Sequence, residues 1–155
     1  TNKKLANYWI HVGCLIINKN KMSKSLKNDI TIKNILNSYH HESIRLFFLS
    51  SHYRKSIDFS YKFLDLIEEK LVKLYLTLIN LNYKNVKVNF IDNYDIEDEF
   101  ISAMKDDFNT PLAISIVYGL QSQIEHLKKI KELKKASRLA KKMMHILNIL
   151  GFNNV

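Results

Sequence analysis

Glycine and proline, the residues that most often interrupt regular structure, are almost absent from this chain. Its 155 residues include only 3 glycines and 1 proline. Leucine, isoleucine and lysine are abundant instead, and asparagine is available for polar turns. A chain of this length can bury one sizeable core. The composition therefore predicts a mainly α fold, in which long helices are joined by polar turns.

Apolar residues recur at helical spacing in three long segments. Ser60 can cap the first helix, and Thr110 with Pro111 fits the N-cap and first position of the second. The third runs from about Glu132 to Leu150, and Gly151 is its expected stop. The residues expected to face the core are Leu64, Ile67, Leu71, Leu74, Tyr75, Leu78 and Leu81, then Ala113, Ile116, Val117, Leu120, Ile124 and Leu127, then Leu133, Ala136, Ala140, Met143, Leu147 and Leu150.

The N-terminal part combines strand and helix patterns. The β-branched and aromatic run from Ala6 to Asn18 predicts a strand, or two strands that turn at Gly13. A loop follows, and Asp29 or Thr31 can then cap a short helix that reaches about Tyr39. The remaining expected elements are a helix over 42–50, an extended connection over 52–56, an Asn-rich linker over 82–94 and a helix over about 96–108.

Charge is unevenly distributed along the chain, whose formal net charge is +9. Acidic residues gather between Asp95 and Asp107, and basic residues between Lys128 and Lys142. Basic residues three or four positions apart predict one helical face that a phosphate backbone could follow. The alternative is a solvated bundle face in a chain that AT-rich codons enrich in lysine. The candidate nucleic-acid-binding residues are Lys128, Lys131, Lys135, Arg138 and Lys142.

Several kinds of protein and site are disfavoured. No apolar run approaches the length of a membrane span, and no signal-peptide pattern opens the chain. The single cysteine, Cys14, excludes an internal disulfide and fits a reducing compartment. Neighbouring His40 and His41 would point about 100° apart on a helix, and no third well-spaced ligand follows. We therefore expect no metal site in this chain.

A basic pentapeptide, Lys21-Met22-Ser23-Lys24-Ser25, carries the clearest chemical signal. Two ammonium groups three positions apart, on a loop with small hydroxyl residues, suit a polyphosphate whose charge shifts during reaction. The alternative is a solvated basic loop. A strand before the pentapeptide and a short helix after it would favour the functional interpretation.

This pentapeptide and its surroundings resemble the cysteinyl-tRNA synthetases, class I aminoacyl-tRNA synthetases in which KMSKS marks the loop that holds ATP. The matching segments are collinear and cover almost the whole chain. They are residues 6–13 (ANYWIHVG), 21–28 (KMSKSLKN), 31–32 (TI), 46–60 (LFFLSSHYRKSIDFS) and 100–111 (FISAMKDDFNTP).

Three positions depart from the family's usual pattern. Lys27 stands where glycine is usual, Lys105 replaces the first of three aspartates, and His41 takes the place of a proline before Glu42. Lys27 could alter the flexibility of the loop or add a phosphate contact. None of the three departures breaks the resemblance.

The resemblance implies a three-part organisation. Residues 1–28 would form the C-terminal edge of a Rossmann catalytic domain with its KMSKS loop, 29–60 a connecting module like the stem-contact module, and 61–155 a helical-bundle tRNA-binding domain. The family's HIGH motif and zinc ligands would lie upstream of Thr1, and its anticodon-reading region beyond Val155. The chain would then be a C-terminal portion of the enzyme, expected to be inactive alone.

The implied activity is the two-step ligation of cysteine to its tRNA. Lys21 and Lys24 would act on the phosphates of ATP, bound with Mg²⁺, while Ser23 and Ser25 would shape the loop; ATP would be held by residues 21–25 as a whole. Zinc would belong to the full-length family. The implied partners are tRNA, ATP and cysteine, for a monomer in the cytoplasm or an organelle. A freestanding tRNA-binding module and the cysteine ligase of mycothiol synthesis remain alternatives.

Overall fold

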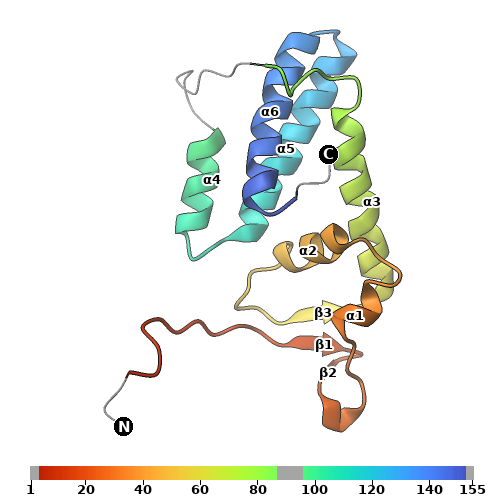
Figure 1. Ribbon diagram of the computed structural model, residues 1–155, viewed down its shortest axis with the longest axis vertical. Coiled ribbons are helices and arrows are strands. Elements are labelled where there is room, and N and C mark those ends of the chain that lie inside the picture. The colour runs from red at the N-terminus through yellow and green to blue at the C-terminus, as the bar shows by residue number, and fades with distance from the viewer. Residues whose placement is uncertain (1–3, 87–95, 153–155) are drawn as a thin grey trace.

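The computed structural model describes residues 4–86 and 96–152, and it confirms a mainly α fold. A small sheet with short helices lies at one end, and the longer helices form a bundle at the other (Figure 1). The elements are β1 (Leu15–Ile17), β2 (Asn20–Lys21), the 3-10 turn η1 (Lys24–Leu26), α1 (Ile32–Ile35), α2 (His41–Leu49), β3 (Ile57–Phe59), α3 (Tyr61–Leu78), α4 (Ile96–Lys105), α5 (Thr110–Lys129) and α6 (Leu133–Ile149).

The sheet has three strands in the order β2-β1-β3. β1 is antiparallel to β2 and parallel to β3, where Leu15 lies opposite Ile57. Asn18 and Lys19 form the two-residue turn between β1 and β2. Both have positive φ, which matches the right-handed twist that a tight hairpin requires.

The strand expected over Ala6 to Asn18 is wrong for most of its length. Only Leu15–Ile17 forms a strand. The described residues before it have no strand beside them, and the side chains of Trp9 and Val12 are 66% and 70% exposed. β propensity reflects packing on neighbouring strands, so the apolar pattern alone does not produce a strand here.

The extended connection expected over 52–56 is also wrong. The backbone N–H of Lys55 donates to the carbonyl of His52 at 2.9 Å and closes a turn. β3 follows directly and pairs with β1. The sequence did not predict β3, because a three-residue strand is too short to show an alternating pattern.

Capping residues in the sequence predicted where several of the helices begin. Ser60 caps α3, where its Oγ accepts from the N–H of Phe63 at 3.2 Å, and Thr31 caps α1. α1 ends at Ile35, earlier than expected. The N-cap of α5 is Asn109, one residue before the expected Thr110.

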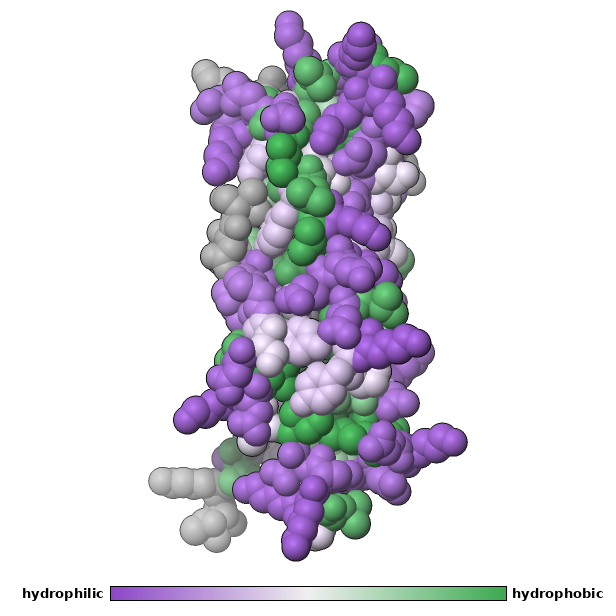
Figure 2. Space-filling model, turned by 90° about the vertical axis from the view of Figure 1, so that its right-hand side faces the viewer, coloured by the Kyte–Doolittle hydropathy of each residue, from purple (hydrophilic) through white to green (hydrophobic). Residues whose placement is uncertain are grey.

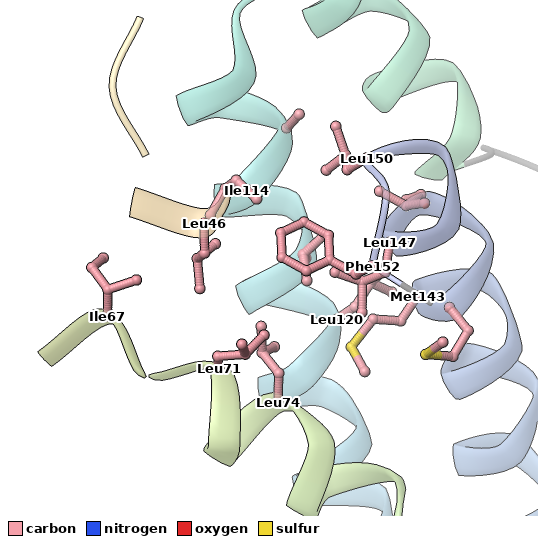
Figure 3. Packing of buried hydrophobic residues seen from close by; sticks show 14 of the residues in the cluster. Leu46, Ile67, Leu71, Leu74, Ile114, Leu120, Met143, Leu147, Leu150 and Phe152 are labelled. Carbon is pink, nitrogen blue, oxygen red and sulfur yellow. The ribbon is translucent and has the colours of Figure 1, made fainter. Parts of the chain in front are cut away.

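One hydrophobic core joins α2 to α3, α5 and α6 (Figure 3). Leu46 of α2 and Phe152 after α6 are both completely buried. Most residues expected to face the core are buried, but Leu133 is 50% exposed because it opens α6 at the edge of the bundle. The expected core residues that are only half-buried are Tyr75, Leu81, Ile116 and Leu127.

Gly151 ends α6 as predicted. Its φ is 86°, its N–H donates to Asn148 O at 3.0 Å, and the N–H of Phe152 donates to Leu147 O at 2.9 Å. These two bonds are those of a Schellman motif. α4 ends at Lys105 rather than near residue 108.

The linker expected over 82–94 lies only partly in the described structure. Residues 82–86 are described, and Tyr83 among them is buried. The rest of the linker, 87–94, lies outside the described residues. The division at residues 28 and 60 stays a prediction.

Candidate functional site

The KMSKS segment leaves β2 and closes into the 3-10 turn η1. Lys21 ends β2, Ser23 is the N-cap, and Lys24 opens η1. The expected loop is therefore partly regular. Both lysine side chains are exposed.

Side chains within the segment fix its shape. The Oγ of Ser23 accepts from the N–H of Leu26 at 3.4 Å and lies 3.2 Å from the Oγ of Ser25. Asn28 bridges the two ends, because its Oδ1 accepts from Ser23 N–H at 2.8 Å and its Nδ2 donates to Lys21 O at 3.3 Å. The backbone that carries both lysines is thus locked by local hydrogen bonds.

Lys27 occupies a left-handed backbone position at the end of η1. Its φ is 51°, and its N–H donates to Lys24 O at 3.1 Å. Glycine adopts this conformation without a steric penalty. The geometry explains why glycine is usual here in the resembling family, and why lysine makes this loop stiffer.

Positive charge in the segment is not neutralised by the described residues. Among them, no carboxylate pairs with Lys21, Lys24 or Lys27. Three ammonium groups on one short, hydrogen-bonded segment fit a polyphosphate, which needs several cations at once. The segment would need little reordering to bind such a ligand.

A second cluster joins the sheet region to the bundle. Arg54 donates through Nε to Asp107 Oδ2 at 2.5 Å and through Nη2 to Oδ1 at 3.1 Å. The hydroxyl of Tyr53 donates to Oδ1 at 2.6 Å, and His52 Nε2 lies 3.8 Å from Oδ2. We call these four residues the Asp107 clasp. Two segments that carry the family resemblance therefore meet in space, which their separation in sequence concealed.

Hydrogen bonds within the Asp107 clasp shift the pKa values of its members. The hydrogen bond from Arg54, and then that from Tyr53, lowers the pKa of the Asp107 carboxyl to about 2. The bond to Asp107 raises the pKa of Tyr53. The side chains of Arg54 and Asp107 are 53% and 44% exposed, so solvent screens their attraction. The bidentate geometry therefore contributes orientation more than stability.

Gly13 connects the clasp to the sheet. Its N–H donates to Tyr53 O at 2.8 Å. A Cβ at this position would lie 2.1 Å from Lys55 O, so no larger residue fits without a backbone shift. Since β1 begins two residues later, the KMSKS segment, the clasp and the turn before α5 are parts of one connected framework.

The five basic residues predicted to share one helical face do not do so. Lys128 belongs to α5, Lys131 lies in the turn after it, and only the other three belong to α6. The chain reverses at Lys131, whose φ of 62° ends the helix. The predicted face followed the spacing of the basic residues across the boundary between two predicted helices, the second of which was expected to begin at about Glu132.

These basic residues also differ in solvent exposure and in the partners that their side chains already have. Lys131, Lys135 and Arg138 are exposed, and Lys142 is half-buried. Lys135 pairs with Glu132 at 3.3 Å. Lys128 donates to the carbonyls of Thr77 at 3.1 Å and Ile79 at 3.5 Å, so it helps to end α3.

Residues 4–86 and 96–152 lack the features of a metal site and of a membrane-spanning helix. No group of three or more His, Cys, Asp or Glu side chains there could hold a metal ion. His40 instead caps α2, where its Nδ1 accepts from the N–H of Glu42 at 3.3 Å. In the same ranges, no helix has the length and apolar character needed to cross a membrane.

Family models match both ends of the chain. Residues 1–69 match the model described as the tRNA synthetases class I (C) catalytic domain, and residues 99–154 match the DALR domain. The chain belongs to the class I aminoacyl-tRNA synthetases. In this synthetase chain, the KMSKS segment and Arg54 fall in the first match, and Asp107 falls in the second. The clasp therefore links the two matched domains.

The relatives of this synthetase chain are cysteine–tRNA ligases. The ligase of Buchnera aphidicola subsp. Baizongia pistaciae is 42% identical over 144 residues, which are 93% of this chain and 30% of that protein. The ligase of Mannheimia succiniciproducens is 41% identical over 145 residues, 94% of this chain and 31% of the relative. The chain thus spans about 30% of the length of the curated relatives that it matches.

Proposed function

We propose that this chain supplies the ATP loop and a tRNA-binding bundle of a cysteine–tRNA ligase. In the first step, the carboxylate of cysteine attacks the α-phosphate of ATP and pyrophosphate leaves. In the second, the terminal ribose hydroxyl of tRNA attacks the cysteinyl carbonyl and displaces AMP. The names of the relatives support this reaction and its amino acid.

The role proposed for Lys21 and Lys24 is electrostatic. Their ammonium groups would stabilise the charge that develops on the triphosphate and on the leaving pyrophosphate, which Mg²⁺ would accompany. The observation that carries this role is the exposed Lys24, with which no carboxylate of the described residues pairs, on a turn locked by Ser23 and Asn28. A charge held by a fixed backbone acts as a preorganised donor.

The role of Lys24 can be tested in the complete ligase. Lys24→Ala should lower the rate of adenylate formation on the order of 10²–10³-fold, as loss of one preorganised donor does. ATP–pyrophosphate exchange measures this rate. Lys33→Ala on α1 removes the same charge from an exposed site outside the KMSKS segment and should leave exchange unchanged. Unchanged exchange in Lys24→Ala would contradict the proposed role.

The proposed tRNA contact rests on the exposed cations Lys131, Lys135 and Arg138. Binding of tRNA to the chain should weaken steeply as salt rises, because each neutralised phosphate releases counterions. Filter binding across a salt series measures the slope. A chain that binds tRNA no better at low salt than at high salt would not use this surface, and the small amine acceptor of the mycothiol ligase would then be the better candidate.

A further inference from the structure

A groove separates the end of α3 from the start of α6. Its volume is about 470 Å³. Figure 1 shows α3 ending and α6 beginning at the same end of the bundle, and Figure 2 shows hydrophilic side chains gathered at that end. The described lining residues are Asn80, Asn82, Val86, Leu133, Lys134, Ser137 and Arg138.

Positive charge and hydrogen-bond donors dominate this lining. Lys134 and Arg138 are exposed, and no carboxylate in the described ranges pairs with either. Asn82 accepts from Asn85 Nδ2 through its Oδ1 at 3.0 Å, which leaves its own amide N–H groups available. None of the described lining residues is acidic. The groove therefore suits an anion.

The backbone of α6 adds further donors. The first N–H groups of a helix have no carbonyl one turn earlier to accept them. Within the described part of the chain, no side chain caps this end of α6. The helix dipole places partial positive charge at the same point. Leu133 and Lys134, which open the helix, also line the groove.

A hydroxyl without a hydrogen-bond partner among the described residues lies in the lining of the groove. Ser137 lines the groove although it is only 6% exposed. Its Oγ has no hydrogen bond to any described residue. The fully buried side-chain oxygens without a partner among the described residues are Glu97 Oε1 and Tyr118 Oη, so Ser137 Oγ, which is not one of them, still reaches the space of the groove. A ligand in the groove would supply that partner.

The walls of the groove are already fixed. The Nζ of Lys141 donates to Val86 O at 2.6 Å, and that of Lys128 donates to Thr77 O at 3.1 Å. These bonds hold the last turn of α3 against α5, and the segment after α3 against α6. An anion would therefore enter a formed site and would have little backbone to order.

We propose that this groove binds a phosphate group. Lys134 and Arg138 neutralise its charge, while the Ser137 hydroxyl and the first N–H groups of α6 donate to its oxygens. Its source is one phosphodiester of tRNA, an assignment that rests on the proposed function. Of these three side chains, the sequence had indicated only Arg138.

A titration with inorganic phosphate tests the groove without tRNA. The amide resonances of residues 133–135 should shift saturably in the unaltered chain. The shifts should be lost in the double variant Lys134→Ala/Arg138→Ala, and Ser137→Ala should weaken binding severalfold. Lys62→Ala/Lys73→Ala removes the same charge from exposed positions on α3 and should bind normally. Shifts that do not saturate, or that persist in the groove variant, would overturn the proposal.

A tRNA titration then tests the source of the phosphate. Relative to the α3 control, the groove variant should bind tRNA about tenfold more weakly, with a salt slope reduced by about 2. Equal binding by the two variants would overturn the assignment to tRNA. If the unaltered chain binds inorganic phosphate but no tRNA, the proposed function fails while the groove stands. Matching circular dichroism melting curves confirm that each variant folds.

Discussion

Single residues of this chain hold backbone conformations that glycine adopts more easily. Lys27, Asp107, Phe108 and Lys131 all have positive φ, which costs an L residue roughly 1–2 kcal/mol. The hydrogen bonds of the Asp107 clasp offset this cost at Asp107, and the N–H of Lys131 donates to the carbonyl of Lys128 at the end of α5. The side chain of Lys27 makes no hydrogen bond, ion pair or ring contact with the described residues that would offset this cost.

Replacing Lys27 should therefore stabilise the chain. Lys27→Gly relieves the left-handed strain but adds freedom to the unfolded chain, and the net gain should be up to about 1 kcal/mol. Urea denaturation measures it. Lys33→Gly, in the middle of α1, should instead cost about 1 kcal/mol. A similar loss in both variants would mean that Lys27 is not held at positive φ.

Two glycines lead to opposite predictions at the scale of single elements, because Gly151 ends a helix and Gly119 lies inside one. Gly151 has φ 86°, and a Cβ there would lie 2.8 Å from the guanidinium of Arg45. Gly151→Ala should therefore cost about 1–2 kcal/mol. Gly119 lies inside α5 with nothing within 4 Å of its Cβ position, so Gly119→Ala should gain about 0.5–1 kcal/mol. Thermal melts that move in the same direction for both would contradict this contrast.

Local chemistry explains which elements the sequence predicted. The bounds of α2 were predicted to within one residue, and the start of α3 was predicted because the capping of Ser60 acts locally. The apolar spacing carried the predicted α3 to Leu81, but the helix ends at Leu78. β3 was missed because its pairing with β1 depends on residues far away in the chain. The prediction of a single basic face was wrong because it grouped residues by spacing across the turn between α5 and α6, where Lys131 has positive φ.

Sites built from residues far apart in the chain could not be predicted either, because local sequence patterns do not show which distant residues meet. The KMSKS segment could be found because its chemistry lies in consecutive residues. The Asp107 clasp joins residues 53 positions apart, and the groove combines the end of α3 with the start of α6. No spacing rule connects such residues, so only the packed fold reveals them.

The clasp predicts a pH dependence for the whole chain. The folded pKa of Asp107, about 2, lies below its ordinary value of 3.8. A depressed carboxyl pKa stabilises the fold above the ordinary value and loses this effect as pH falls through the folded one. Asp107→Asn should thus lower the melting temperature at pH 7, and the difference from the unaltered chain should shrink between about pH 4 and pH 2.

The matched control for the clasp is Asp29→Asn. Asp29 is exposed, and its side chain makes no hydrogen bond or ion pair with the other described residues. Its replacement should change the melting temperature little at either pH. A deficit in Asp107→Asn that is equally large at pH 7 and pH 2 would show that Asp107 acts by packing rather than by its charge.

The central strand of the sheet has one neighbour close in the chain and one far from it. β2 follows β1 after a two-residue turn, whereas β3 arrives only after α1 and α2. Hairpins close within microseconds, but pairing across a long loop must first overcome the entropy of closing it. The hairpin that leads into the KMSKS segment can therefore form before β3 joins the sheet. Of the two lysines proposed to act on ATP, Lys21 ends β2 and Lys24 opens η1, so both follow a hairpin that gains its third strand only after α1 and α2.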